Sequence, residues 1–411
     1  MYDEPKAPEA GGCGPILPAP GRAQVPPRRA AFEHVRAQGR ASRADVARSL
    51  GISAASVTTL TADLIAMGLL REVPGTVGGE PREAGRGRPP VALEIVPEGR
   101  QVVGIKLSDE RHTAVLADFG GRRIAESVRP ASATRRTLAE AVEEVAALVA
   151  GLGGAPVTAV GVGLSGLVDH ASGRVAWSPL LDGADLSFKA ACEDRLGVPV
   201  HVDNDANVLT LAELWFGSGR ALADFAVVTI EHGVGMGLVL GSRLFRGTRG
   251  MGLELGHVKV RLDGALCRCG QRGCLEAYLA DYALAREAWT ALGRDPRKAQ
   301  SPQATLEALF AAAKSGDEAA RAIFARAGRY LAVGLANVQQ LFDPSLIILS
   351  GERMRYDLLY AEEVLAEMRD LTLLKGRTPA RVEIHAWGDL VWAQGAVALA
   401  LGAVTEEALG G

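Results

Sequence analysis

Aromatic residues are scarce in this sequence, at 5% of 411 positions, whereas there are 49 glycines. A hydrophobic core must therefore be built mainly from Ala, Val and Leu, with many glycine turns between elements. No apolar run reaches the roughly 18 residues that a membrane-spanning helix needs, so we expect no membrane insertion. The formal net charge is only −3, which excludes a uniformly basic nucleic-acid coat but leaves room for a small basic module on an acidic body.

Cysteine is also sparse, and its placement is informative. Three of the five cysteines lie between Cys267 and Cys274, which indicates metal ligation in a reducing cytoplasm rather than disulfide bonding. Residues 1–27 are rich in Pro, Gly and Ala and contain three acidic residues, so we expect a disordered tail and not a signal peptide. The remaining length is too great for one core and predicts two or three domains.

Residues 28–97 have the pattern of a winged helix-turn-helix. A first helix ends near Gly39, Ser42 caps a second, and Ser53 caps a third after a short glycine turn. An extended segment follows from Leu69 to Val73. Helix, tight turn, helix and strand are typical of a DNA-binding domain, although a small helical bundle without a DNA role fits the same pattern.

Charge favours the DNA-binding interpretation. Between Gly21 and Pro90 there are eleven arginines and six acidic residues, a net +5, so the rest of the chain carries −8. The third helix offers short hydroxyl donors for phosphates or base edges, and the wing offers arginines for a narrow minor groove. The candidate DNA contacts are Ser53, Ser56, Thr58, Thr59, Thr61, Arg86 and Arg88. Helix capping by Ser53, water-facing threonines and a plain basic linker are the alternatives.

Residues 98–411 predict an α/β domain with two similar lobes that face a cleft, the second spanning about 225–385. Each half begins with strands and continues with helices and a further strand. The expected elements of the first half are strands 101–107, 112–118 and 123–128, a helix over 137–152 and a strand over 157–164. Those of the second are strands 225–230 and 237–240, helices within 277–342 and a strand over 346–349.

One imidazole and three thiols within 18 positions, His257, Cys267, Cys269 and Cys274, match a closed four-ligand zinc site. Gly270 and Gly273 let the backbone turn tightly between the thiols. Four protein ligands leave no open position, which favours a structural ion over a catalytic one. Unligated buried cysteines are the alternative.

Three further clusters could carry chemistry. The polar run 203–207 follows an apolar strand, and its Asp205 could act as a general base or hold a hydroxyl, unless the run only caps a helix. Glu254 and Glu276 flank the cysteine region and could accept hydrogen bonds from hydroxyls, or could simply be solvated. The glycine-rich turn 233–237 could approach a phosphate or form a plain hairpin.

Together these elements resemble the ROK family of bacterial sugar-responsive repressors and sugar kinases. The motifs that carry the resemblance are Gly85-Arg86-Gly87-Arg88-Pro89-Pro90, Asn204-Asp205-Ala206-Asn207, Glu254-Leu255-Gly256-His257 and the cysteine cluster. The resemblance implies a two-lobed fold like that of actin and hexokinase (ribonuclease H-like), with a sugar between the lobes. It implies zinc on His257, Cys267, Cys269 and Cys274, and sugar contacts from Asn204, Asp205, Glu254, His257 and Glu276.

Departures from the kinase branch of the family concern the phosphate side. Where family kinases have Asp and a Gly-Gly-Thr-Lys loop, this chain has Lys106 and then Ser108-Asp109-Glu110-Arg111. Two carboxylates there repel a triphosphate and their side chains block close backbone approach. Family kinases have a second Gly-Gly pair on the adenosine side. It corresponds here to Ser350-Gly351, so one of its two glycines is lost. We therefore expect no catalytic residue and no kinase activity, with Asp205 a vestigial general base, because phosphoryl transfer depends on phosphate positioning.

The sequence thus predicts a cytoplasmic transcriptional regulator, a repressor of carbohydrate-metabolism genes, that is nucleoid-associated when bound to DNA. Its expected partners are a near-palindromic operator, a sugar effector, and copies of itself in a homodimer or homotetramer. Two alternatives remain. One is an ATP-dependent sugar kinase with an accessory DNA-binding head. The other is a regulator controlled by a protein partner, because Leu180 stands where the family places a sugar-binding Asn.

Overall fold

The computed structural model describes residues 11–16, 25–74, 91–132, 134–153, 156–291, 301–351, 354, 356–359, 362–373, 375–386 and 388–410. The chain divides into two compact units. Unit 1 comprises Asp224–Leu238 and Gly252–Gly388, and unit 2 comprises Pro5–Ala223, Val239–Met251 and Asp389–Gly411. Among the described helices, none is alone long and apolar enough to cross a membrane; two consecutive helices reach that length only as a pair bent by 115°.

The predicted three helices are confirmed in unit 2 as α1 (Pro27–Gln38), α2 (Arg43–Leu50) and α3 (Ala54–Ala66). Ser42 forms a capping box with Asp45 at the start of α2, and the Ser53 side chain accepts a hydrogen bond from Ser56 N at the start of α3. The 115° bend between α2 and α3 is in the helix-turn-helix range. β1 (Arg40–Ala41), β3 (Val91–Ile95) and β2 (Leu70–Pro74) form a sheet in that order. We call the segment from Pro27 to Ile95 the head.

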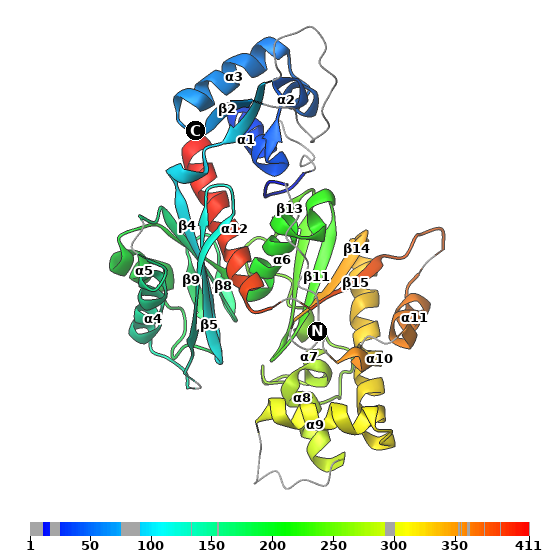
Figure 1. Ribbon diagram of the computed structural model, residues 1–411. Coiled ribbons are helices and arrows are strands. Elements are labelled where there is room, and N and C mark those ends of the chain that lie inside the picture. Colours follow the sequence, from blue (N-terminus) through cyan, green and yellow to red (C-terminus); the bar gives the residue numbers. More distant parts are fainter. Residues whose placement is uncertain are drawn as a thin grey trace. The chain divides into compact units, whose positions relative to one another are not determined.

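The rest of unit 2 is built on a five-stranded sheet of order β10-β7-β4-β5-β6. β4 pairs in parallel with β7 and antiparallel with β5, as expected for three initial strands followed by crossover helices. Figure 1 shows α4 and α5 on one side of this sheet and α6 and α12 on the other. The elements are η2 (Pro97–Gly99), β4 (Gln101–Leu107), β5 (Arg111–Asp118), β6 (Arg123–Pro130), α4 (Leu138–Ala150), β7 (Ala159–Leu164), β8 (Leu167–Asp169), β9 (Arg174–Trp177), α5 (Phe188–Leu196), β10 (Val200–Asn204), α6 (Asp205–Phe216), η3 (Ser218–Ala221), β13 (Arg243–Phe245) and α12 (Leu390–Leu409).

Two glycines allow α12 to lie directly on the sheet. A Cβ at Gly104 on β4 would overlap Ala393 O, and a Cβ at Gly161 on β7 would overlap Ala396 O. The C-terminal helix, which the sequence analysis did not anticipate, therefore closes the core of unit 2.

Unit 1 repeats the same topology. The second five-stranded sheet, whose edge strand β13 belongs to unit 2, has the order β13-β12-β11-β14-β15, so its first strand is central, the next two follow on one side and the last two on the other, as in the first sheet. The prediction of two similar lobes is thus confirmed at the level of strand order. The elements are β11 (Phe225–Ile230), β12 (Val234–Leu240), η4 (Leu255–His257), α7 (Glu276–Leu279), α8 (Asp281–Ala291), α9 (Pro302–Lys314), α10 (Glu318–Phe342), β14 (Leu346–Ser350), η7 (Asp357–Leu359), α11 (Glu362–Leu371) and β15 (Arg381–His385).

Part of the expected disordered tail is packed. In residues 11–16 the Cys13 side chain is only 3% exposed, and Gly14 N donates to Trp215 O at 2.9 Å. Small residues can pack into a narrow space in a protein, so a segment rich in Pro, Gly and Ala is not necessarily disordered. Residues 1–10 and 17–24 of the same segment lie outside the described residues.

Candidate functional site

The predicted metal ligands come together in unit 1. Ligand atoms of His257, Cys267, Cys269 and Cys274 all lie within 4.8 Å of one another, with Cys269 Sγ 3.7 Å from Cys274 Sγ and His257 Nδ1 3.7 Å from Cys267 Sγ. The cluster could therefore hold one metal ion. Gly273 has φ 77°, and a Cβ there would overlap the carbonyl of Arg261, so the turn between the thiols needs glycine.

Two side chains connect this cluster with its surroundings. Lys259 Nζ donates to Cys274 Sγ at 3.0 Å, which offsets part of the negative charge that three thiolates would carry. Tyr282 Oη donates to Cys267 Sγ at 3.5 Å and to Glu276 Oε1 at 3.4 Å. Sequence reasoning missed Tyr282, because its position eight residues after the last thiol forms no recognisable ligand spacing.

The candidate carboxylates of unit 1 are held by the same loops. Glu254 immediately precedes η4, and its carbonyl accepts from His257 N at 3.0 Å. Glu276 begins α7 directly after Cys274-Leu275, and its Oε2 accepts from Val234 N at 3.4 Å. The Glu276 carboxylate is half-buried and the Glu254 side chain is exposed. Both residues thus lie next to metal-ligand positions in the chain, and their role as hydroxyl acceptors stays a prediction.

The polar run at the start of α6 contains residues with different roles. Asp203 and Asn207 are buried and bonded to each other, because Asn207 Nδ2 donates to Asp203 Oδ1 at 2.8 Å. Asn204 is the N-cap of α6: its Oδ1 accepts from Ala206 N and its Nδ2 donates to Gly166 O, both at 2.8 Å. The capping alternative therefore holds for Asn204, whose side chain is nevertheless half-exposed.

Asp205 has a hydroxyl partner that the sequence did not indicate. Ser165 Oγ donates a short hydrogen bond to Asp205 Oδ2, and Ala206 N donates to Asp205 Oδ1 at 2.9 Å. Ser165 directly follows β7, and β7 and β10 are parallel neighbours, so their carboxyl ends meet at one sheet edge. That placement was the available signal for Ser165.

The residues that depart from the kinase pattern, Lys106 and the β4–β5 turn, make contacts within unit 2. Lys106 is 8% exposed, with Nζ 3.5 Å from the centre of the Trp392 ring. In the β4–β5 turn, Ser108 Oγ donates to Arg111 O at 2.6 Å, and Arg111 pairs with Asp389 at 2.5 Å. The turn is thus closed by contacts within unit 2.

The sugar-facing loop of the family corresponds here to buried residues. Leu180 and Leu181 are 7% and 1% exposed and belong to the core of unit 2. Ser178 Oγ donates to Ser165 O at 2.6 Å. The leucines therefore contribute packing where the family pattern has an amide.

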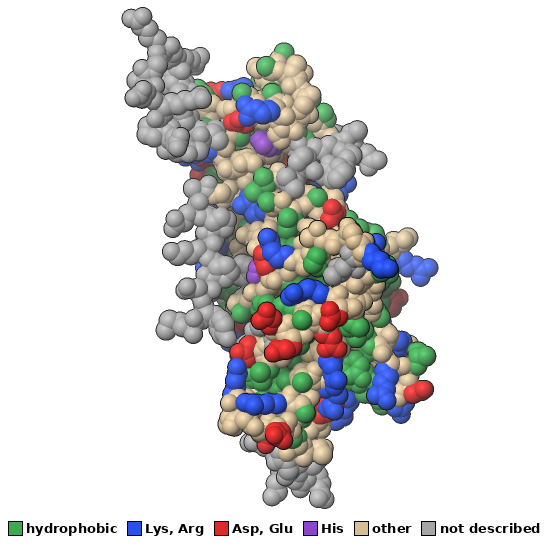
Figure 2. All heavy atoms as spheres, turned by 90° about the vertical axis from the view of Figure 1, so that its right-hand side faces the viewer, with side chains coloured by type: hydrophobic (Ala, Val, Ile, Leu, Met, Phe, Trp, Pro, Cys, Tyr) green, Lys and Arg blue, Asp and Glu red, His purple; other side chains and the backbone are tan. Residues whose placement is uncertain are grey.

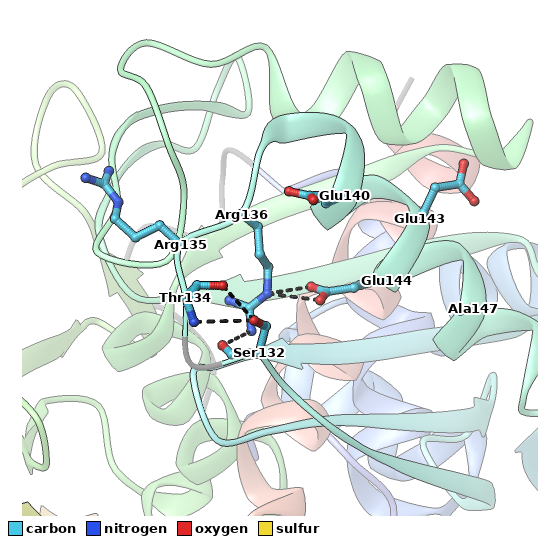
Figure 3. A pocket seen from close by; sticks show the side chains of 8 residues that line it. All are labelled: Ser132, Thr134, Arg135, Arg136, Glu140, Glu143, Glu144 and Ala147. Carbon is cyan, nitrogen blue, oxygen red and sulfur yellow. Dashed lines mark hydrogen bonds and ion pairs between the residues drawn. The ribbon is translucent and has the colours of Figure 1, made fainter. Parts of the chain in front are cut away.

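A hollow of about 410 Å³ lies between α4 and a group of four residues, Ser132, Thr134, Arg135 and Arg136. Figure 3 shows Arg136 pointing toward Glu144, to which its Nε is bonded at 3.0 Å. The other charged side chains at the hollow also have partners: Glu140 accepts a hydrogen bond from Thr137 Oγ1, Glu143 pairs with Arg195, and Arg135 pairs with Asp182. Each charged side chain that lines the hollow thus already pairs with another residue of the chain.

The head presents its predicted hydroxyls on α3. Ser53, Ser56, Thr58 and Thr59 are exposed, and Thr58 Oγ1 and Thr59 Oγ1 each donate to the carbonyl four residues earlier. Thr61 does not share this surface: it is fully buried and accepts from Arg43 Nε at 3.0 Å. Arg86 and Arg88 lie outside the described residues.

Many arginines of the head are paired, which the charge count did not reveal. Arg28 pairs with Asp63, Arg43 with Glu72, and Arg71 with Glu94 and Glu98. On the face of the molecule in Figure 2, acidic and basic side chains are interspersed rather than gathered by sign. Positive charge free for DNA must therefore come from few positions of the described head.

Comparison with known proteins gives a consistent result. The sequence profile of the ROK family matches residues 102–403. The N-acetylglucosamine repressor of Escherichia coli O157:H7 is 30% identical over 321 residues, 76% of this chain and 77% of that protein.

Two solved structures resemble the chain to different extents. A ROK family transcriptional regulator, described as a homologue of the E. coli MLC protein, has a TM-score of 0.76 at 26% identity, covering 93% of this chain and 96% of that one. A ROK family glucokinase from Streptomyces griseus, solved with glucose and AMPPNP, has a TM-score of 0.63 at 31% identity and covers 73% of this chain and 99% of its own.

Proposed function

This chain belongs to the ROK family, and from that premise we propose that it is a DNA-binding transcriptional regulator, a repressor of carbohydrate-metabolism genes that responds to a sugar. The observation that carries the proposal is the head. A glucokinase of the family matches 73% of this chain at its full length, whereas a regulator of the family matches 93%. The segment that distinguishes the two includes a winged helix-turn-helix, whose established use in proteins is to read DNA.

In this proposal α3 is the recognition helix. Ser53, Ser56, Thr58 and Thr59 lie exposed on its first two turns, where hydroxyls can reach phosphates and base edges. Arg86 and Arg88 of the wing would enter the neighbouring minor groove. A homodimer or homotetramer would place two such helices about 34–36 Å apart on a near-palindromic operator.

The ion proposed for the cysteine cluster is zinc. Three thiolates and one imidazole are one of the donor sets of structural zinc sites, and two sulfurs bound to one zinc at a tetrahedral angle lie about 3.8 Å apart. The 3.7 Å separation of Cys269 Sγ and Cys274 Sγ supports this assignment. With four protein ligands the zinc is structural, and it would supply cross-linking of the loop that carries Glu254, His257 and Glu276.

The effector is proposed to be a monosaccharide or a derivative held by Asn204, Asp205, Glu254, His257 and Glu276. Carboxylates and amides accept and donate the hydrogen bonds that sugar hydroxyls need. His257 Nδ1 is 3.7 Å from Cys267 Sγ, so Nδ1 would serve the metal and Nε2 a hydroxyl. No catalytic residue is proposed, and Asp205 is a vestigial general base that binds rather than activates.

The test is operator binding by the full-length protein in the presence of sugars. We expect tight binding to DNA selected from the source genome, weakened by N-acetylglucosamine, glucose or xylose about 5- to 150-fold, the range of a typical coupling. Ser56→Asp, which places a negative charge on exposed α3, should abolish binding, whereas Ser132→Asp on an exposed site of the body should not. Glu276→Gln should abolish the sugar response but leave DNA binding intact, and Glu363→Gln on exposed α11 is its control. Absence of specific DNA binding would refute the proposal.

A sugar kinase with an accessory DNA-binding head is the second candidate, favoured by the Asp205 carboxylate with its Ser165 partner and by the similarity to a glucokinase. A coupled assay of ADP release with hexoses and pentoses decides between the two. We expect no sugar-dependent release, because the β4–β5 turn contains Asp109 and Glu110.

A further inference from the structure

Helix α6 connects the proposed effector residues with the head inside unit 2. It begins at Asp205, directly after Asn204, and ends at Phe216, a length of about 18 Å at 1.5 Å per residue. Ten of its twelve residues, Ala206 to Trp215, are buried, and it packs along α12. A helix packed in this way moves as a rigid body, so a displacement of its first turn is carried to its last.

The last turn of α6 holds the segment of residues 11–16, which we call the strap. Gly14 N donates to Trp215 O at 2.9 Å, and Ile16 N donates to Arg220 O, just after α6, at 2.8 Å. Cys13 of the strap is 3% exposed, and a Cβ on Gly121 of the β5–β6 turn would meet its Sγ at 2.7 Å. The middle of the strap, Cys13 and Gly14, is therefore buried against the end of α6 and the β5–β6 turn, a contact that we call the seam, whereas Gly11 and Ile16 are exposed.

Arg220 bonds the strap and the head at the same time. It lies in η3, is 6% exposed, and donates from Nε to Gly14 O at 3.0 Å and from Nη2 to Ala37 O of α1 at 2.6 Å. One guanidinium thus joins the end of α6, the strap and the first helix of the head. Its forked donors suit two carbonyls at once.

Arg36 of α1 makes the complementary contacts from the head. It is 2% exposed, donates from Nη1 to Thr405 Oγ1 of α12 at 2.8 Å, and lies 4.5 Å from the centre of the Trp215 ring. Its Nε has no hydrogen-bond partner among the described residues. Burial lowers the pKa of this guanidinium. A buried cation bonded to neutral groups regains hydration when exposed, which makes the docked head easier to release than an apolar contact would.

We propose that α6, the strap and Arg220 form a connection that transmits effector occupancy at Asn204 and Asp205 to the orientation of the head, with Arg220 as the positioning residue. The inference rests on the proposed function for the identity of the two ends, a sugar site and a DNA-binding helix. The contacts themselves do not depend on that function: the bond from Arg220 to Ala37 O and the contact of Arg36 with the Trp215 ring both join α1 to the end of α6 and η3.

The thiol of Cys13 in the strap can report whether the strap stays packed. Cys13 is buried in the seam, and Cys192 is fully buried in the core of unit 2. Burial raises the pKa of the Cys13 thiol and raises that of Cys192 to about 12. Both thiols therefore react slowly with iodoacetamide unless their surroundings open. Peptide mass spectrometry of the alkylated full-length protein separates opening of the seam, at Cys13, from opening of the core, at Cys192.

The first experiment compares Arg220→Ala with Arg195→Ala, an exposed arginine on α5 that pairs with Glu143. Arg220→Ala leaves two buried carbonyls without a donor, so alkylation of Cys13 should accelerate at least roughly tenfold, whereas Cys192 should be unaffected. Arg220→Lys, which can reach one carbonyl at a time, should be intermediate. Arg195→Ala should match the unaltered protein. An unchanged Cys13 rate, or equal acceleration at Cys13 and Cys192, would overturn the proposal.

The second experiment tests transmission. N-acetylglucosamine, glucose and xylose are titrated calorimetrically, and operator affinity is measured with and without a sugar that binds. Arg220→Ala should bind the sugar as the unaltered protein does, but its operator affinity should no longer respond. An equal response in both proteins would refute transmission and leave the proposed function standing. If no sugar binds the unaltered protein, the proposed effector role fails, and the alkylation rates still decide whether Arg220 holds the seam.

Discussion

Asp203→Asn removes a buried negative charge at the end of β10. The Asp203 side chain is 0% exposed, and its Oδ2 accepts from Arg246 Nε at 2.7 Å and lies 3.5 Å from His170 Nδ1. Its Oδ1 accepts from Asn204 N and Asn207 Nδ2. An asparagine can keep the Oδ1 contacts, but its amide then turns a donor toward the Arg246 guanidinium. The substitution therefore removes the charged partner of Arg246 without changing the volume of the side chain at position 203.

The expected cost follows from burial. Removal of one partner from a buried ion pair typically costs 3–5 kcal/mol. Because the Arg246 side chain is 21% exposed and can regain some water, we expect the lower end, about 3 kcal/mol. For a unit of this size that corresponds to a fall in Tm of about 6–12 °C.

The matched control is Asp185→Asn. Asp185 also pairs with an arginine at 2.7 Å, but its side chain is 72% exposed and that of Arg174 is 42% exposed, so the loss should be about 0–1 kcal/mol. Urea-dependent alkylation of buried Cys192 measures the free energy of unfolding of unit 2 in all three proteins. Equal stability losses in the two variants would refute the argument that burial decides the energy of the pair.

Three further outcomes are expected. Gly104→Ala should destabilise unit 2 by about 1–3 kcal/mol, because a Cβ at this position overlaps α12. Gly99→Ala is the control and should leave stability unchanged, because the space around its Cβ is open. Thermal unfolding measures the stability of both variants. Cys267→Ser should lower the bound zinc measured by plasma emission from about one ion per chain and expose unit 1 to protease, whereas Cys192→Ser should leave the metal content unchanged. Burial lowers the pKa of His201 from 6.5, so its contribution to stability is present above pH 6.5 and is lost as pH falls through the lower folded value. His201→Gln should therefore flatten the dependence of urea stability on pH below 6.5, and an unchanged slope would exclude this histidine.

The sequence was most informative where structure is local. The caps at Ser42 and Ser53 depend on bonds to residues three positions later, so the head helices could be predicted nearly to the residue. The metal cluster could be predicted because its ligands span only 18 positions, and glycine turns brought them together.

The partners of the other site residues depend on tertiary structure. Ser165 lies 40 residues from Asp205 and Arg246 lies 43 residues from Asp203, and only the pairing of the parallel strands and the segment after β13 bring them together. Cys13 was assigned to a disordered tail because the composition of a segment does not show which other parts of the protein it packs against, and in the structure Cys13 is buried. Long-range contacts of single side chains leave no periodic signal in the sequence.

The repeated strand order allows the turns that follow the two central strands to be compared. The turn after the central strand of unit 2 is closed by the Arg111–Asp389 pair at 2.5 Å. The corresponding turn of unit 1, after β11, is closed by His232, which pairs with buried Asp281 at 3.0 Å. In each unit a charged pair thus lies beside the turn that follows the central strand. Restoring glycine at the β4–β5 turn alone would leave the Asp389 carboxylate beside that turn, so we expect it not to produce sugar-dependent ADP release. A single substitution at the β4–β5 turn that did yield such release would contradict this reasoning.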